Sequence, residues 1–110
     1  MDQALLVLTN LADTASAQAL ARALVERRLA ACVNVLPAVQ SIYRWNGAIE
    51  EAAEVTLLIK TTAARYAELE QAIRALHPYE LPEVIAVPVS AGLPAYLGWI
   101  AQETRKEIDV

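Results

Sequence analysis

The most extended feature of the hydrophobic pattern is a pair of apolar-rich arms over residues 40–60, QSIYRWNGAIEEAAEVTLLIK, that meet at Asn46-Gly47. Asn-Gly is the strongest two-residue hairpin signal, because both central residues of a type I′ turn need a positive φ angle. The pattern therefore predicts one long β-hairpin. Its return arm, residues 48–60, would span about 40 Å of strand, whereas a helix of about 15 residues covers only about 22 Å of sheet.

Both faces of this predicted hairpin are apolar. Pairing across the turn places Tyr43 and Trp45 on one face and Ile42 and Ile49 on the other. Neither face is suited to water, and the helices of one small domain are too short to cover the full length of the hairpin. We therefore expect another copy of the chain to cover it.

The rest of the chain predicts alternating strands and helices. Short apolar runs are typical of buried strands, and apolar residues three and four apart after a Ser, Thr or Asp are typical of capped helices. We predict strands at residues 4–9, 31–36 and 84–89, and helices from Asp13 or Thr14 to about Arg28, from Thr61 or Thr62 to about Leu76, and from Pro94 to Ile100. Pro37 should end or bend the second strand, because proline cannot donate to the ladder.

This order, β-α-β-β-α-β followed by a short C-terminal helix, predicts an α+β fold of the ferredoxin-like type in one domain, residues 1–110. In that fold both helices lie on one side of an antiparallel sheet. Strand segments such as LLVLT and VTLLI are apolar at nearly every position, so the sheet face without helices also needs a partner.

The composition agrees with an oligomer. Apolar residues make up 56% of the 110 residues, and the mean hydropathy of +0.32 is high for a monomer of 12.0 kDa. No stretch approaches the roughly 20 uninterrupted apolar residues of a transmembrane helix, so we expect no membrane association. The opening Met-Asp-Gln lacks the basic charge of a signal peptide, and one cysteine excludes an intrachain disulfide. We expect a cytoplasmic protein.

The charge distribution argues against nucleic acid as a partner. Thirteen acidic residues against nine basic ones give a formal net charge of −4. The only adjacent bases are Arg27-Arg28 and Arg105-Lys106, whereas nucleic-acid binding normally needs a basic stripe that displaces counterions.

Few residues are candidates for chemistry, and none forms a known catalytic motif, so we expect no enzyme. His77, the only histidine, lies in HPYELPE, where two prolines stiffen a loop between helix and strand. Imidazole is the commonest neutral metal ligand, although a histidine at a helix end is also a common structural feature. Cys32 can be a thiolate ligand or a small buried hydrophobe, and Lys60 before the predicted helix start can hold an anion. The acids after the turn, Glu50, Glu51 and Glu54, are typical of solvated edge charges.

Four separated blocks, AACVNVLP, SIYRWNGAIEEAAEVTLLIKT, LHPYELPEVIAVPV and PAYLGWI, closely resemble the CutA divalent-cation-tolerance family. The resemblance implies a ferredoxin-like subunit in a tight homotrimer, with long hairpins that reach onto neighbouring subunits. It also implies a role in tolerance to copper and other divalent metals, with copper binding in some members. The residues that it places in an intersubunit pocket are Cys32, Trp45, Glu51, Lys60, His77, Tyr79 and Glu83.

Within this set we predict His77, Cys32 and Glu83 as metal ligands, because imidazole and thiolate suit Cu²⁺ and, less strongly, Zn²⁺. No cofactor is obligatory in this interpretation. Some copper-binding relatives have a cysteine where this chain has Thr9 and a histidine where it has Leu76, so binding should be weak.

Two other functions remain open from the sequence. The CutA assembly is similar to the PII signal-transduction trimer, which suggests a small-molecule or signalling trimer with an anionic ligand near Lys60. The third possibility is a stable trimeric scaffold whose pocket residues only pack the interface.

Overall fold

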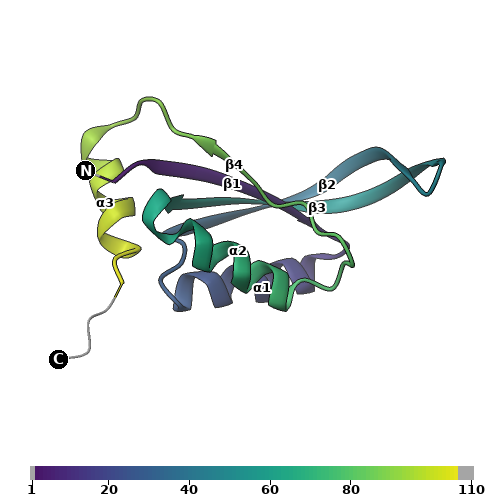
Figure 1. Ribbon diagram of the computed structural model, residues 1–110, viewed down its shortest axis with the longest axis horizontal. Coiled ribbons are helices and arrows are strands. Elements are labelled where there is room, and N and C mark those ends of the chain that lie inside the picture. The colour runs from purple at the N-terminus through teal and green to yellow at the C-terminus, as the bar shows by residue number, and fades with distance from the viewer. Residues whose placement is uncertain (1, 107–110) are drawn as a thin grey trace.

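The computed structural model describes residues 2–106, and its antiparallel sheet has the strand order β2-β3-β1-β4 (Figure 1). The elements in chain order are β1 (Ala4–Leu11), α1 (Thr14–Glu26), β2 (Cys32–Trp45), β3 (Ala48–Thr62), the short 3₁₀ turn η1 (Ala63–Arg65), α2 (Tyr66–Leu76), β4 (Ile85–Pro88) and α3 (Pro94–Glu103). The predicted α+β fold of the ferredoxin-like type, with its long hairpin and C-terminal helix, is confirmed.

Helices α1 and α2 lie on one side of the sheet (Figure 1), as the predicted topology requires. Alternate residues of the central strands, including Val7, Leu57 and Ile59, are fully buried on that side. They pack with Leu24 of α1 and Ile73 of α2, which come from the apolar stripes of the two helices. This layer forms the core of the subunit.

The predicted starts of the first two helical segments, at Asp13 and at Thr62, are both confirmed. Asp13 caps α1, because its Oδ1 accepts the Ser16 N–H at 2.7 Å, and this bond holds the pKa of Asp13 below its usual range. Thr62 ends β3, where it pairs with Ala4, and it is also the N-cap of η1, which leads directly into α2 at Tyr66. Its side chain makes no capping hydrogen bond, unlike that of Asp13.

The second strand bends at Pro37 and continues into the hairpin. Strand β2 has a register shift between Leu36 and Val39, and Ala38 has a φ of 64°. Such a bulge accommodates a proline that cannot donate to the ladder. The predicted strand at residues 31–36 and the first hairpin arm are therefore one bent strand.

The hairpin turns at Asn46 and Gly47, whose φ angles of 50° and 80° are the positive values that the sequence predicted. Strand β1 pairs with β3 only as far as Val55, so residues 48–54 project beyond it by about 23 Å. The projecting arms extend away from both helices in Figure 1. Ile42 and Ile49 are 66% and 68% exposed there, so the predicted apolar surface has no cover within the subunit.

The sheet face opposite α1 and α2 is also apolar. It presents alternate residues of the three strands β1, β3 and β4, namely Leu6, Leu8, Leu58, Ile85 and Val87. Helix α3 covers only one end of this face, where Thr62 and Thr104 share a hydroxyl hydrogen bond of 3.5 Å. Within residues 2–106, no helix combines the length and apolar character needed to cross a membrane.

Candidate functional site

His77 joins the end of α2 to the end of β1. Its Nδ1 accepts the Tyr79 backbone N–H at 3.1 Å, so Nε2 has the proton and donates to the Asn10 carbonyl at 2.6 Å. The residue is only 7% exposed. Both ring nitrogens are therefore engaged in hydrogen bonds that hold the HPY segment against the sheet, and a metal ion would have to displace one of them.

Asn10 is the residue at which the contacts of this region meet. Besides its carbonyl bond with His77, its side-chain Oδ1 accepts the Thr56 hydroxyl at 2.6 Å, and its Nδ2 donates to Glu83 Oε1 at 3.2 Å. One asparagine thus fixes the loop after α2 at two points to the centre of the sheet. Asn10 could not be singled out from the sequence, because nothing local distinguishes it from any other polar residue at a strand end.

Tyr79 is held between His77 and a carboxylate of the hairpin. Its ring makes a T-shaped contact with the imidazole, with centroids 4.6 Å apart, and its hydroxyl donates to Glu54 Oε2 at 2.8 Å. Burial, followed by the hydrogen bond to Glu54 and the charge of that carboxylate, raises the pKa of Tyr79 to about 12. Glu54 is only 9% exposed, so the expectation that it is a solvated edge charge is wrong.

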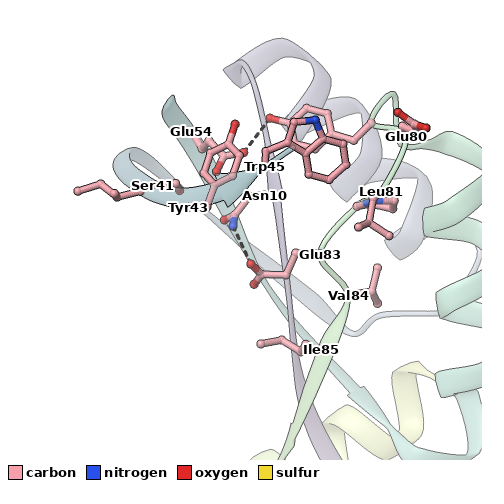
Figure 2. Close-up of a pocket in the computed structure, with 13 residues that line it drawn as sticks. Asn10, Ser41, Tyr43, Trp45, Glu54, Glu80, Leu81, Glu83, Val84 and Ile85 are labelled. Atoms are coloured by element: carbon pink, nitrogen blue, oxygen red, sulfur yellow. Dashed lines mark hydrogen bonds between the residues drawn. The ribbon is translucent and has the colours of Figure 1, made fainter. Parts of the chain in front are cut away.

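These contacts border a pocket of about 890 Å³ between the hairpin and the loop at residues 79–85. Tyr43, Trp45 and Glu54 line it from the hairpin, and Glu80 and Glu83 line it from the loop (Figure 2). The same figure shows the two hydrogen bonds, Tyr79 to Glu54 and Asn10 to Glu83, that fix the walls. The arrangement combines aromatic rings with carboxylates and can hold a positively charged group.

The family to which this fold and site belong follows from comparison with known proteins. The family model described as CutA1 divalent ion tolerance protein matches residues 5–103. The chain belongs to the CutA1 family. The resemblance inferred from the four sequence blocks is therefore confirmed.

Individual relatives of this CutA1 chain agree in sequence and fold. It is 45% identical to the divalent-cation tolerance protein CutA of Thermus thermophilus over 98 residues. This matched region covers 89% of this chain and 95% of the Thermus protein. It is 52% identical to Protein CutA of Mus musculus over 81% of this chain, but it spans only 50% of the length of the mouse protein. The crystal structure of CutA1 from Oryza sativa has a TM-score of 0.92 at 34% identity, covering 96% and 97% of the two chains.

Of the predicted site residues of this CutA1 chain, the structure brings together one group and separates another. Trp45, Tyr79 and Glu83 border the pocket, with His77 directly behind Tyr79. Glu51 pairs with Ile42 on the opposite face of the hairpin from Trp45. No group of three or more potential metal ligands occurs within residues 2–106.

Cys32 and Lys60 lie at the other end of the sheet. They are direct cross-strand partners, and Lys60 Nζ lies 5.7 Å from the centre of the Tyr96 ring of α3. Thr56, which contacts Asn10, is four residues along β3 from Lys60, or about 13 Å. Cys32 and His77 therefore do not share a site within one subunit.

Proposed function

We propose that this chain acts in divalent cation tolerance as a non-catalytic homotrimer that binds divalent ions weakly at the boundaries between its subunits. The observation that supports assembly most directly is the hairpin beyond β1, where Ile42 and Ile49 are exposed on one face and Tyr43 and Trp45 on the other. Isolated two-stranded ribbons are marginally stable in water, so such a projection needs a packing partner. A neighbouring copy supplies one with the same apolar character.

The oligomeric state can be tested directly. Obligate interfaces bury about 2,000 Å² or more and stabilise the fold itself. Light scattering at micromolar concentration should therefore give a mass three times 12.0 kDa. A folded monomer at that concentration would contradict the proposal, and a dimer would contradict the trimer that the family resemblance implies.

The geometry supports weak ion binding better than tight binding. Glu83 is exposed at the mouth of the pocket and makes one hydrogen bond, from Asn10 to Oε1, so its second oxygen can face an ion. His77 can join such a site only by giving up its bond to Asn10 or to Tyr79. The loss of that hydrogen bond opposes metal binding, which supports micromolar affinity at best.

Calorimetric titration of Cu²⁺, then Zn²⁺, into the parent protein and His77→Ala tests the predicted ligands. Copper should bind the parent more tightly than zinc, and binding should weaken in acid, because protons compete with the metal ion for its ligands. Glu83→Gln, which keeps the shape of the side chain, should also weaken binding, whereas the Cys32→Ser variant tests whether a thiolate from another subunit contributes. Equal binding by the parent and His77→Ala, or none by either, would remove His77 from the site.

The anion-binding alternative has less support. It relied on backbone N–H groups at a helix start beside Lys60. In η1, however, the Ala63 N–H donates to the Gln3 carbonyl and the Ala64 N–H donates to Asp2 Oδ2, and the Lys60 ammonium lies over the Tyr96 ring. A thermal-shift screen with nucleotides and organic anions separates a PII-like ligand sensor from a scaffold without ligand. The cytoplasmic location stays a prediction.

A further inference from the structure

Arg65 is a buried cation at the start of the second helical segment. The residue is 7% exposed, and its Nη1 donates to Glu68 Oε1 at 3.0 Å while its Nε donates to the Arg28 carbonyl at 3.4 Å. Its Nη2 has no hydrogen-bond partner among residues 2–106. A guanidinium presents five N–H donors, so most of the donors of this buried group have no acceptor in the described chain. A buried charge in this state is costly, and an anion beside it would remove that cost.

Glu68 balances this charge only in part. Its side chain is 48% exposed, and the Oε1 that accepts from Arg65 also lies 3.6 Å from Lys106 Nζ. One carboxylate oxygen therefore serves two cations. The contact also uses only Nη1 of Arg65, whereas a guanidinium binds an anion most strongly through two parallel N–H groups. A second anion can still bind at Nη2.

Arg65 lines a cavity of about 380 Å³ between the end of α1 and the first turns of α2. Arg27 brings a second guanidinium to this cavity and Gln71 brings an amide, while the buried Leu29 and Ala72 contribute apolar wall. The Arg27 side chain is exposed and makes no hydrogen bond or ion pair with the part of the chain that the structure describes. Two guanidinium groups thus share the cavity with a single carboxylate, so its charge is positive although the net charge of the chain is −4.

The backbone beside this cavity does not repel an anion, because the last carbonyls of α1 are already bonded. The Arg27 N–H donates to the Ala23 carbonyl at 3.1 Å. The Leu29 N–H donates to the Leu24 carbonyl at 3.0 Å. The cavity also lies in the helix layer, at the end of the subunit away from the hairpin (Figure 1). It is therefore apart from the hairpin and from the sheet face without helices, the two surfaces for which a neighbouring copy is proposed.

We propose that this cavity binds a phosphate group, free or as an organic ester, with Arg65 and Arg27 as its donors. The planar fork of a guanidinium matches the oxygens of a phosphate, and two such groups suit a dianion. The phosphate would accept from Nη2 of Arg65, which Glu68 leaves without a partner. Its binding goes beyond the proposed role in metal tolerance and does not depend on it. The donors are also separate from Lys60, which lies on the sheet face without helices.

The test is a calorimetric titration of inorganic phosphate, and then of n-butyl phosphate, into the full chain in its native oligomeric state. The ionic strength is held constant, because salt screens the exposed Arg27. Both phosphates should bind, whereas n-butanol, which has the same alkyl chain without the phosphate, should not. Contact with Leu29 and Ala72 should favour the ester by about fourfold for each methylene that is buried. Tighter binding of the ester supports an organic phosphate as ligand, and equal binding supports the free ion.

Three variants locate the binding. Arg65→Lys keeps the charge but removes the planar fork, and it should weaken phosphate binding by about tenfold or more. Arg27→Gln removes the exposed donor and should weaken binding by about three- to fivefold. Arg74→Gln is the matched control, because it removes an exposed charge from the last turn of α2 outside the cavity, and it should leave the affinity unchanged. Circular dichroism and light scattering establish that each variant keeps the fold and the mass of the parent, and Arg27→Gln decides the matter if Arg65→Lys does not fold.

The contrary outcomes are equally definite. Absence of phosphate binding in the parent would overturn the proposal, and so would an unchanged affinity in Arg27→Gln. An equal loss of affinity in Arg74→Gln would reduce the effect to general attraction by a basic surface. Binding of n-butanol as tight as that of n-butyl phosphate would make the cavity an apolar site. Failure of copper binding alone would refute the metal proposal and leave the phosphate result standing.

Discussion

Removal of one oxygen atom, in Tyr79→Phe, tests how strongly the buried carboxylate holds the loop after α2. The substitution deletes the hydroxyl that donates to Glu54 at 2.8 Å and keeps the ring against His77. The side chain of Glu54, a residue only 9% exposed, then loses its one hydrogen bond within the described chain. Hydrogen bonds to charged groups contribute about 1.5–3 kcal/mol, and we expect the free energy of unfolding at neutral pH to fall by this amount.

The same hydroxyl should make stability depend on pH in the alkaline range. The pKa of Tyr79 is raised from 10.0 to about 12 in the folded state, so between these values the unfolded state has lost a proton that the folded state retains. The free energy of unfolding therefore falls as the pH rises above 10, and this loss of stability ends near pH 12. A shift of two units corresponds to at most about 2.7 kcal/mol. The Tyr79→Phe variant should not show this part of the loss of stability at alkaline pH.

The assay is denaturant unfolding of both proteins at neutral pH and at steps up to pH 12, at one protein concentration because assembly affects stability. Tyr43→Phe is the matched control, since its hydroxyl makes no hydrogen bond within residues 2–106, and its effect should stay within about 0.5 kcal/mol. Equal stabilities of the Tyr79→Phe and Tyr43→Phe variants would refute the reasoning. So would an alkaline loss of the same size in parent and Tyr79→Phe.

Three further substitutions test assembly, turn and core. Trp45→Ala should weaken the proposed oligomer by about 3–5 kcal/mol, because it removes an indole that a neighbouring copy would bury. Full assembly of the variant at high dilution, or the emission of a water-exposed indole in the parent, would contradict this prediction. Gly47→Ala should lower the free energy of unfolding by about 1–2 kcal/mol, because the residue at this turn position has a φ of 80°. Gly98→Ala, in α3 with open space at the new Cβ, should raise it by about 0.5–1 kcal/mol. Denaturant midpoints of the two variants that shift in the same direction would contradict this pair of predictions. Leu57→Ala should cost about 2–5 kcal/mol in unfolding, and a smaller loss would mean that the core relaxes around the cavity.

Local chemistry explains why the hairpin and the first helix could be predicted. The Asn46-Gly47 turn depends only on the φ angles of two residues, and the Asp13 cap depends on a bond to an amide three residues away. The start of the second helical segment agrees with both local and distant contacts. Thr62 pairs with Ala4 at the end of β3 and is the N-cap of η1, and an N-cap residue is extended in either role. The local cap signal was therefore sufficient to locate this start.

The candidate site could be predicted only on its hairpin side. Strand alternation places Glu54 on the same face as Tyr43 and Trp45, and the register of the turn makes that inference possible from sequence. The burial of Glu54 depends instead on Tyr79, which arrives from a loop 25 residues further along the chain. That loop is positioned by bonds to Asn10 across 67 and 73 residues, and no local pattern encodes contacts of such separation. A carboxylate that looks like its solvated neighbours in the sequence therefore becomes the buried charge around which the pocket is built.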